Sequence, residues 1–355
     1  MNRTLSYDLL ENETARHSAI VQNLCLEGEG ALVSNPLYRC FQLIQVIECI
    51  IAIVSLPLVY CRYIQSAAFH INLKILLCLY YQIAGVYVLV VLICTIFQAV
   101  LWLTSRNPCD VYPSRFAHEF FNLSELYCLL YLLASQPLVS LERTIATLRV
   151  DTYEKCSKKS AAVLYVIASL AIPGGLLYYV YHDVRFTEPH LSCFSDQSKA
   201  TDRITIVSAL AIFLSLSSVI VQKILTFINS KRKTRATDTR LSTQYQLSEN
   251  IAATSFVSWI LFLQMLASVG YSAASLICGF FIEGLFNNDR NKKLIAKEGY
   301  YIIPLAMVLL PWLSVYLLKE RNKTRSSTIE SSIHQSKGDN AMVLYSSMLK
   351  EQWSK

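Results

Sequence analysis

The chain contains an adjacent acid and base, Glu142 and Arg143, at the end of a long apolar run that begins near Phe116. A loop with several basic residues, among them Arg149 and Lys155, follows the pair. Where a membrane helix meets water, a carboxylate can neutralise a neighbouring guanidinium until a partner competes for it. This chemistry makes the pair a candidate switch. The alternative is an arginine that only orients the helix, with Glu142 as its surface ion pair of little energetic value.

Three polar side chains earlier in the same run lie at helical spacing. His118, Asn122 and Glu125 follow one another at steps of four and three residues, which places them on one face of a helix. Glu125 precedes Glu142 by about 25 Å of helix, which is the depth of a ligand pocket in a seven-helix bundle. With Tyr131 nearby, the carboxylate can bind a cation or a hydrogen-bond donor. A polar stripe wetted by lipid headgroups explains the same pattern.

Another acidic residue, Glu48, lies within an earlier apolar run, about 14 Å of helix beyond Arg39. An ionisable side chain at that depth faces other helices rather than lipid, and it is a candidate functional group. Both a place in the ligand pocket and a purely structural hydrogen bond to a neighbouring helix fit this position.

A basic cluster, Lys231, Arg232 and Lys233, lies between two later apolar runs. Such a cluster beside a membrane can bind anionic lipid or a protein partner. Tyr245 follows it at helical spacing from Leu241, as in a helix that extends the next run into water. An ordinary solvated helix start fits these residues equally well.

The composition identifies the elements that must position these residues. The chain has 355 residues, of which 54% are hydrophobic and 16% are charged, whereas a soluble domain has about 25% charged residues. Its basic residues cluster beside apolar runs, as membrane orientation requires, so the net charge of +7 does not indicate nucleic-acid binding. The sequence motifs of common enzymes and the spacings of metal ligands are absent. We therefore predict an all-α integral membrane protein that is not an enzyme and has no cofactor or metal.

Seven apolar runs of about 20 residues or more can each cross the hydrocarbon core. They predict a seven-transmembrane helix bundle at residues 38–318, between an N-terminal tail, 1–37, and a disordered Ser- and Thr-rich tail, 319–355. The runs span about residues 39–61, 73–103, 116–147, 161–182, 204–229, 251–282 and 300–318.

The distribution of lysine and arginine favours an orientation with the N-terminus outside and the C-terminal tail in the cytoplasm. The basic segment 290–297 counts against this orientation, because it would lie outside. The glycosylation sequons at Asn2 and Asn12 fit an outside N-terminus.

Two cysteines in polar segments, Cys109 and Cys193, would also lie outside, where disulfides persist. A bond between them would join the loop after the fourth run to the start of the third and shape the mouth of a pocket. Cys25 lies on the same side and can pair with either one, so the alternative pairings remain open.

Two segments together resemble the nematode serpentine chemoreceptors of the Sra superfamily, most closely the alpha/beta class, Srab. Residues 142–147 read Glu-Arg-Thr-Ile-Ala-Thr, and residues 241–250 read Leu-Ser-x-x-Tyr-Gln-x-x-Glu-Asn. The resemblance covers about residues 36–325 and implies a G-protein-coupled receptor of sensory neurons. Glu142 and Arg143 then take the place of the acid–arginine pair that ends the third helix of rhodopsin-like receptors.

The chain departs from the rhodopsin-like pattern at several positions. Thr144 occupies the position of an aromatic residue, and Cys109 lies further from Glu142 than usual. The sixth apolar run contains Trp259 but no proline below it. Gln244 also stands where the class motif has a basic residue. These departures concern the moving parts of such a receptor and not its seven-span topology.

The resemblance therefore implies a chemosensory receptor in the plasma membrane, in the cilia of sensory neurons. A small molecule would bind from outside near Glu125, and a heterotrimeric G protein would contact Arg143 and the basic cluster; membrane lipid is the third partner. The few charges within the spans favour a neutral or weakly polar ligand. The alternatives are a seven-span transporter or ion pathway that uses Glu48 and Glu125, and a membrane scaffold without a ligand.

Overall fold

Helices make up the regular structure of the part of the chain that the computed structural model describes, residues 35–106, 108–149, 159–184, 186, 192, 198–235, 241–285, 290–335 and 345–347. A π-helical turn, Tyr60–Ile64, extends the first helix, and two short 3₁₀ turns precede α5 and α8. The helices are α3 (Pro36–Val59), α4 (Ile71–Thr104), α5 (Arg115–Leu148), α7 (Lys159–Tyr181), α8 (Thr201–Arg235), α9 (Leu241–Leu285), α10 (Arg290–Gly299) and α11 (Ile303–Gln335).

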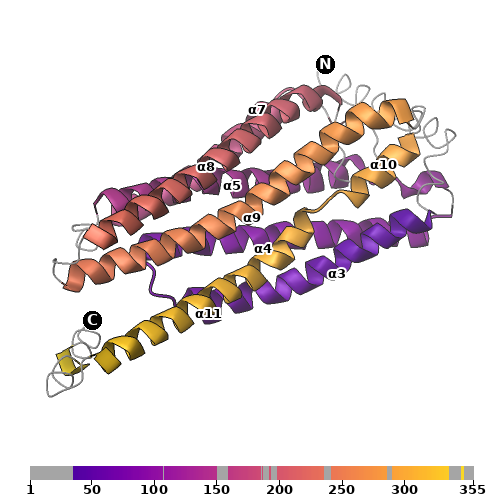
Figure 1. Cartoon of the computed structure of the whole chain (residues 1–355). Coiled ribbons are helices and arrows are strands. Elements are labelled where there is room, and N and C mark those ends of the chain that lie inside the picture. Colours follow the sequence, from indigo (N-terminus) through magenta and orange to yellow (C-terminus); the bar gives the residue numbers. More distant parts are fainter. Residues whose placement is uncertain are drawn as a thin grey trace.

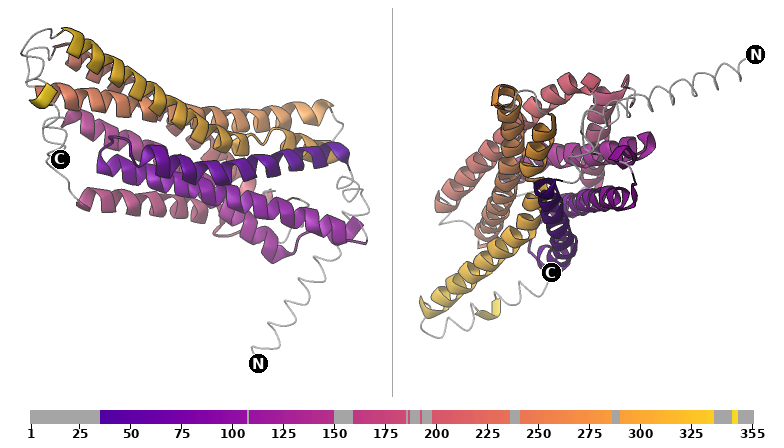
Figure 2. Two further views of the ribbon diagram at one scale, coloured as in Figure 1. Left: turned by 90° about the horizontal axis from the view of Figure 1, so that it is seen from below. Right: turned by 90° about the vertical axis from the view of Figure 1, so that its right-hand side faces the viewer.

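The long helices lie side by side along one axis, and the short α10 lies at one end of the bundle (Figures 1 and 2). Successive contacts close the bundle: α3 packs on α4 and α11, α4 on α5, α5 on α7 and α8, α8 on α9, and α9 on α11. The predicted seven-helix bundle is confirmed. We name the two ends of the bundle after α5 residues, the Glu125 end and the Arg143 end.

Six of the seven long helices are long and apolar enough to cross a membrane. The exception is α5, whose buried positions include many polar residues. Because α5 contacts α4, α7, α8 and α9, its buried side chains face protein rather than lipid, and polar groups within a membrane bundle occur on such inward faces. The six apolar spans are Pro36–Ile64, Ile71–Thr104, Val163–Tyr181, Thr201–Thr234, Gln246–Ala274 and Ile295–Thr324.

Local sequence explains several helix starts. Before α3, the Asn35 side chain accepts a hydrogen bond from the Leu37 backbone N–H at 2.9 Å. Before α5, Ser114 Oγ accepts one from the Ala117 N–H at 3.3 Å. Such caps satisfy backbone donors that the first turn of a helix leaves without partners.

The end of α11 differs from the prediction of a disordered tail that begins at residue 319. The helix continues to Gln335, so residues 319–335 are helical. Adding residues to an existing helix avoids the cost of a new nucleus, and the transmembrane part of α11 supplies that nucleus. Most of the remaining tail lies outside the described residues.

The bundle separates an apolar outer surface from a mixed interior. Large apolar side chains such as Leu43, Leu58, Phe213 and Phe227 are exposed on the outside, as expected of helices that face lipid tails. The largest buried cluster joins α3, α4, α9 and α11 with part of α5. This cluster fills the interior between these helices, and several buried polar side chains of α5 lie on the side where α5 packs on α7 and α8.

Candidate functional site

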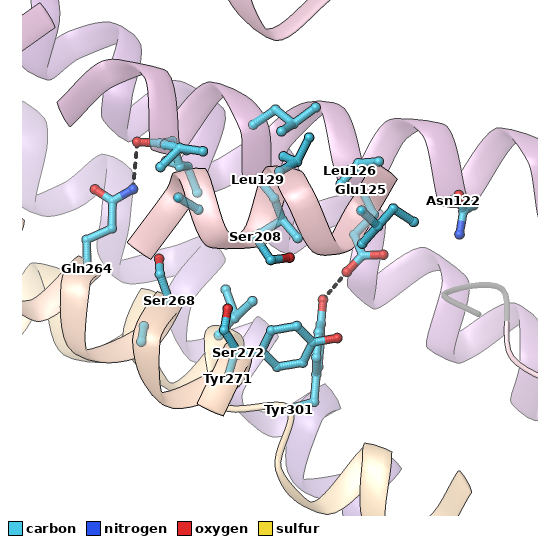
Figure 3. Close-up of a pocket in the computed structure, with 18 of the residues that line it drawn as sticks. Asn122, Glu125, Leu126, Leu129, Ser208, Gln264, Ser268, Tyr271, Ser272 and Tyr301 are labelled. Carbon is cyan, nitrogen blue, oxygen red and sulfur yellow. Dashed lines mark hydrogen bonds between the residues drawn. The ribbon is translucent and has the colours of Figure 1, made fainter. Parts of the chain in front are cut away.

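A cavity of about 160 Å³ lies inside the Glu125 end of the bundle, between α5, α8, α9 and the residues that join α10 to α11. One wall is apolar and consists mainly of leucines on α5 with Ile204, Val207 and Ala211 on α8. Polar groups of α9 and of the segment around Tyr301 line the opposite side, as Figure 3 shows. An apolar cavity with a few converging polar groups is the usual form of a small-molecule site.

The central polar group of the cavity is Glu125. The Tyr301 hydroxyl donates a hydrogen bond to Glu125 Oε1 (Figure 3). The hydroxyls of Tyr301 and Tyr87 are 2.5 Å apart, so a chain of hydrogen bonds connects α5 to α4. The Tyr271 ring packs edge-on against Tyr301, with 5.7 Å between ring centroids. A ligand that reached Glu125 would therefore also disturb a contact between helices.

The predicted pocket residues on α5 divide into two groups. Asn122 and Glu125 line the cavity, and Asn122 Oδ1 accepts a 2.6 Å hydrogen bond from Tyr181 of α7. His118 is buried one turn away from the cavity, against the ring of Phe186. Tyr131 is also buried outside the lining, and its hydroxyl donates to Ser169 Oγ of α7 at 3.1 Å.

The fifth predicted pocket residue, Glu48, is half-buried on α3 and does not line this cavity. Its neighbour by one turn, Gln45, instead reaches the cavity rim, where its Nε2 donates to Glu298 Oε2 at 2.9 Å. Glu298 and Lys297 of α10 both line the cavity. The basic segment that counted against the predicted orientation therefore forms part of a helix that borders the cavity.

At the Arg143 end, Glu142 and Arg143 form a bidentate ion pair. The distances are 2.5 Å for Arg143 Nε to Glu142 Oε2 and 2.5 Å for Arg143 Nη2 to Glu142 Oε1. Glu142 is 0% exposed and Arg143 is 2% exposed. The alternative of a surface ion pair is therefore wrong. Removing one partner of a buried pair leaves a charge that is costly to keep away from water.

The arginine also connects α5 to the two helices beside it. Arg143 Nη1 donates to Asn250 Oδ1 of α9 at 3.3 Å. Asn250 and Asn229 of α8 both donate to Thr147 Oγ1, at 3.4 and 3.0 Å, and Arg232 Nη1 donates to the Thr147 carbonyl at 2.5 Å. Together with Glu142, these residues form what we call the helix-end network, which holds the ends of α5, α8 and α9 together.

Exposed basic side chains surround this network. Lys231 and Lys233 are exposed on α8, and Lys233 Nζ donates to Ser248 Oγ of α9 at 3.3 Å. An ion pair between Arg321 and Glu249 joins α11 to α9 at the same end. Tyr245 belongs to α9, but its side chain lies outside the described residues.

An exposed ion pair joins α7 and α8 at the Glu125 end. Arg203 contacts Asp183 through two hydrogen bonds, of 2.5 and 2.8 Å. These hydrogen bonds from the guanidinium lower the pKa of Asp183 to about 2. Arg203 Nη1 also donates to the Val180 carbonyl in the last turn of α7, so it closes the end of that helix.

The remaining predicted sites fall outside the described residues. Asn2, Asn12 and Cys193 belong to segments that the structure does not describe, and the side chain of Cys109 is likewise undescribed. The disulfide and the glycosylation sites therefore stay predictions.

Sequence reasoning missed three kinds of partner. Tyr301 and Tyr87 carry no local signal, since Tyr301 lies 176 residues from Glu125. Thr147 and Asn250 did have a signal, because they are the last residues of the two segments that carry the family resemblance, 142–147 and 241–250. Both belong to the helix-end network. Asn229 precedes the basic cluster by two residues and had no recognised pattern.

Comparison with known proteins gives a family match over nearly the whole chain. Residues 31–354 match the model described as serpentine type 7TM GPCR receptor class ab chemoreceptor. Serpentine receptor class beta-16 of Caenorhabditis elegans is 25% identical over 332 residues, which cover 93% of this chain and 96% of that protein. Class beta-17 is 25% identical, covering 90% and 88% of the two chains. Class beta-3 is 22% identical, covering 91% and 94%.

Proposed function

The chain belongs to the class ab family of serpentine seven-transmembrane chemoreceptors, and from this premise we propose that it binds a small molecule in the Glu125 cavity and activates a heterotrimeric G protein at the Arg143 end. In this proposal the N-terminus lies outside the cell and the receptor resides in the plasma membrane of sensory neurons, in their cilia. The cavity would then open to the outside and the helix-end network to the cytoplasm.

The observation that carries the proposal is the position of both sites on one helix. Glu125 lines the cavity, and Arg143 lies 18 residues further along α5, or about 27 Å. Neighbouring helices contact both sites: α9 and α8 contribute to the cavity lining and also to the helix-end network. A change in the packing of α5 against α8 and α9 would therefore alter both the cavity lining and the helix-end network.

The proposed mechanism has two states. In the closed state the helix-end network joins α5, α8 and α9, and Arg143 is held by Glu142. A ligand that contacts Glu125 competes with Tyr301 for the carboxylate. It favours a state in which α5 and α9 separate at the Arg143 end. The ligand must bind the open state more tightly than the closed one to shift the balance. Arg143 and the exposed basic residues of α8 would then contact the G protein.

The proposal is tested in cells that express the full chain with a promiscuous Gα subunit, by recording calcium responses to a panel of volatile and water-soluble compounds. Surface display is measured with an N-terminal tag on unpermeabilised cells. A response that requires the Gα subunit supports the proposal. A displayed chain whose responses persist without Gα contradicts it, and a tag that is reachable only after permeabilisation contradicts the orientation.

The informative variant is the double substitution Glu142→Gln with Arg143→Met. Because the pair is buried, alanine at Arg143 alone would confuse misfolding with loss of coupling, whereas removing both charges at similar volume is often tolerated. We expect normal surface display and lost signalling. Signalling at the level of the parent chain would remove Arg143 from the coupling mechanism.

The alternative of an ion pathway through Glu48 and Glu125 gains no support from the described residues, since Glu48 does not line the cavity that contains Glu125. A compound-evoked membrane current that needs no G protein would revive it.

A further inference from the structure

The contact between Tyr301 and Glu125 shows which chemical group the carboxylate accepts inside the cavity. Tyr301 lies between α10 and α11, and its hydroxyl donates a hydrogen bond to Glu125 Oε1 of α5. Both residues line the cavity (Figure 3). The group that contacts the carboxylate is therefore a phenol, and a ligand with a hydroxyl of the same kind can take its place.

The Tyr301 hydroxyl can leave Glu125 without losing its other contact. It lies 2.5 Å from the Tyr87 hydroxyl of α4, and either oxygen can be the donor of that hydrogen bond. A hydroxyl can donate one proton and also accept, so Tyr301 keeps Tyr87 as a partner when another group binds the carboxylate. Exchange of one hydroxyl for another on the same acceptor replaces a hydrogen bond rather than removing it. The displacement therefore costs less than leaving a buried acceptor without a partner.

The volume of the cavity limits the size of the ligand. The cavity measures about 160 Å³. In another protein, an engineered apolar cavity of about 150 Å³ binds one molecule of benzene. One aromatic ring with a hydroxyl and a small apolar substituent therefore matches the space, whereas a second ring exceeds it.

The walls of the cavity suit a neutral aromatic ring better than a charged group. Leucines of α5, among them Leu129, form the apolar side. Opposite them, the Tyr271 ring of α9 lines the cavity and packs edge-on against Tyr301, with 5.7 Å between ring centroids. A ligand ring can make the same edge-on contact. An ammonium group would instead lose its hydration against the leucines, and Lys297 already places a cation in the same lining.

We propose that the cavity binds a small phenol, a single aromatic ring whose hydroxyl replaces that of Tyr301 on Glu125. The inference rests on the proposed function of the cavity and names the ligand class for that site. In the bound state Tyr301 keeps its contact with Tyr87 of α4 and loses its contact with α5. Ligand binding therefore releases α5 from the segment that leads into α11.

The first measurement is the melting temperature of the purified full chain in lipid nanodiscs, titrated with compounds of matched size. 4-Methylphenol carries the hydroxyl, 4-methylanisole has a methyl ether that cannot donate, and 4-methylbenzylamine carries a positive charge. We expect the phenol to raise the melting temperature, because a ligand that binds only the folded chain stabilises it. The ether enters lipid at least as readily as the phenol, so it measures the effect of lipid partitioning. An equal rise with the ether, a larger rise with the amine, or no rise with the phenol would overturn the proposal.

The second measurement is the same titration on Tyr301→Phe, which keeps the ring and removes the competing hydroxyl. The Kd for 4-methylphenol should fall about tenfold, which corresponds to the net contribution of one hydrogen bond. Tyr131→Phe is the matched control, because Tyr131 is also buried but its hydroxyl donates to Ser169 Oγ at 3.1 Å, outside the cavity lining. The control should leave the Kd unchanged. A tyrosine that only supports the cavity wall would weaken binding when altered, so an unchanged or higher Kd in Tyr301→Phe would overturn the displacement.

Binding to the purified chain and signalling in cells fail separately. A chain that binds 4-methylphenol in both titrations but gives no response that depends on Gα keeps the phenol site and loses the proposed receptor mechanism. A chain that responds in cells to other compounds, while 4-methylphenol leaves its melting temperature unchanged, keeps the proposed function and loses this inference.

Discussion

The two ends of α5 each hold one buried glutamate, but the surroundings of the two carboxylates differ. Glu142 is matched by the guanidinium of Arg143, and hydrogen bonds to α8 and α9 surround the pair. Glu125 is held by a tyrosine hydroxyl at the edge of a cavity with an apolar wall. One end is closed by polar contacts between helices, whereas the other leaves space between the same helices.

This difference shows how one helix can serve two purposes. A charge matched by an opposite charge is suited to hold helices in place, and it is costly to break. A carboxylate that accepts a hydrogen bond from a tyrosine hydroxyl can exchange that hydroxyl for a ligand at much lower cost. The comparison predicts that substitutions at the two ends differ in size and in kind.

The largest effect is expected from Glu142→Ala, which leaves the buried guanidinium of Arg143 without its carboxylate. We expect a loss of about 3–5 kcal/mol in the free energy of unfolding, since an uncompensated buried charge remains. The melting temperature and the folded yield in detergent measure this loss. The double variant Glu142→Gln with Arg143→Met should recover most of it, and a failure to recover would show that the pair itself, rather than the isolated charge, carries the stability.

A smaller effect is expected from Tyr301→Phe at the cavity. The variant keeps the ring but removes the hydroxyl that joins Glu125 to Tyr87, so we expect a loss of about 1–3 kcal/mol from the unsatisfied buried groups. Thermal unfolding of the purified chain provides the value. Tyr316→Phe is the control, because Tyr316 is 65% exposed, and its melting temperature should not change. A loss at Tyr301 as large as that for Glu142→Ala would erase the distinction between the two ends.

The third prediction concerns the link between α5 and α9. Asn250→Ala removes the acceptor for Arg143 Nη1 and a donor to Thr147, so the closed state should lose about 1 kcal/mol. We expect ligand-independent signalling to rise about fivefold, which corresponds to that free energy. Reporter output without added compound, normalised to surface display, measures the rise. Reduced basal output in this variant would argue that the network supports the active state instead.

The smallest effect is expected from Asp183→Asn at the exposed ion pair with Arg203. The folded pKa of Asp183, about 2, lies below the value of about 3.9 for a free aspartate. The contribution of this pair to stability is therefore complete above pH 4 and is lost as the pH falls toward 2. Between pH 5 and pH 7, melting curves of the parent and the variant should show the same pH dependence, and a divergence in that range would contradict the assignment.

The sequence predicted the bundle better than the cavity. Apolar length locates the spans because each must cross the same thickness of hydrocarbon, so six of the seven follow directly from composition. The helical spacing of Asn122 and Glu125 also located two residues of the cavity wall. The class ab resemblance, carried by residues 142–147 and 241–250, is confirmed over most of the chain.

Contacts between distant segments could not be read from one sequence. Nothing in the local pattern around Tyr301 indicates that it reaches Glu125, and nothing around Tyr131 indicates that it turns toward α7 instead of the cavity. The burial of Glu142 was equally hidden, since a charged pair at a predicted membrane boundary looks the same whether solvent or other helices surround it. These features depend on how the helices rotate against one another, which apolar length does not determine.

The polar character of α5 has a consequence for the synthesis of the protein. Insertion of a segment into a bilayer by the translocon depends on its own apolarity, and charged residues near its centre oppose insertion. Since α5 falls short of the apolarity of the other spans, we expect it to enter the membrane together with α4 or α7 rather than alone. Substitutions that make α5 still more polar would then impair its insertion into the membrane during synthesis. The resulting chains would have a wrong topology and could not bind a ligand.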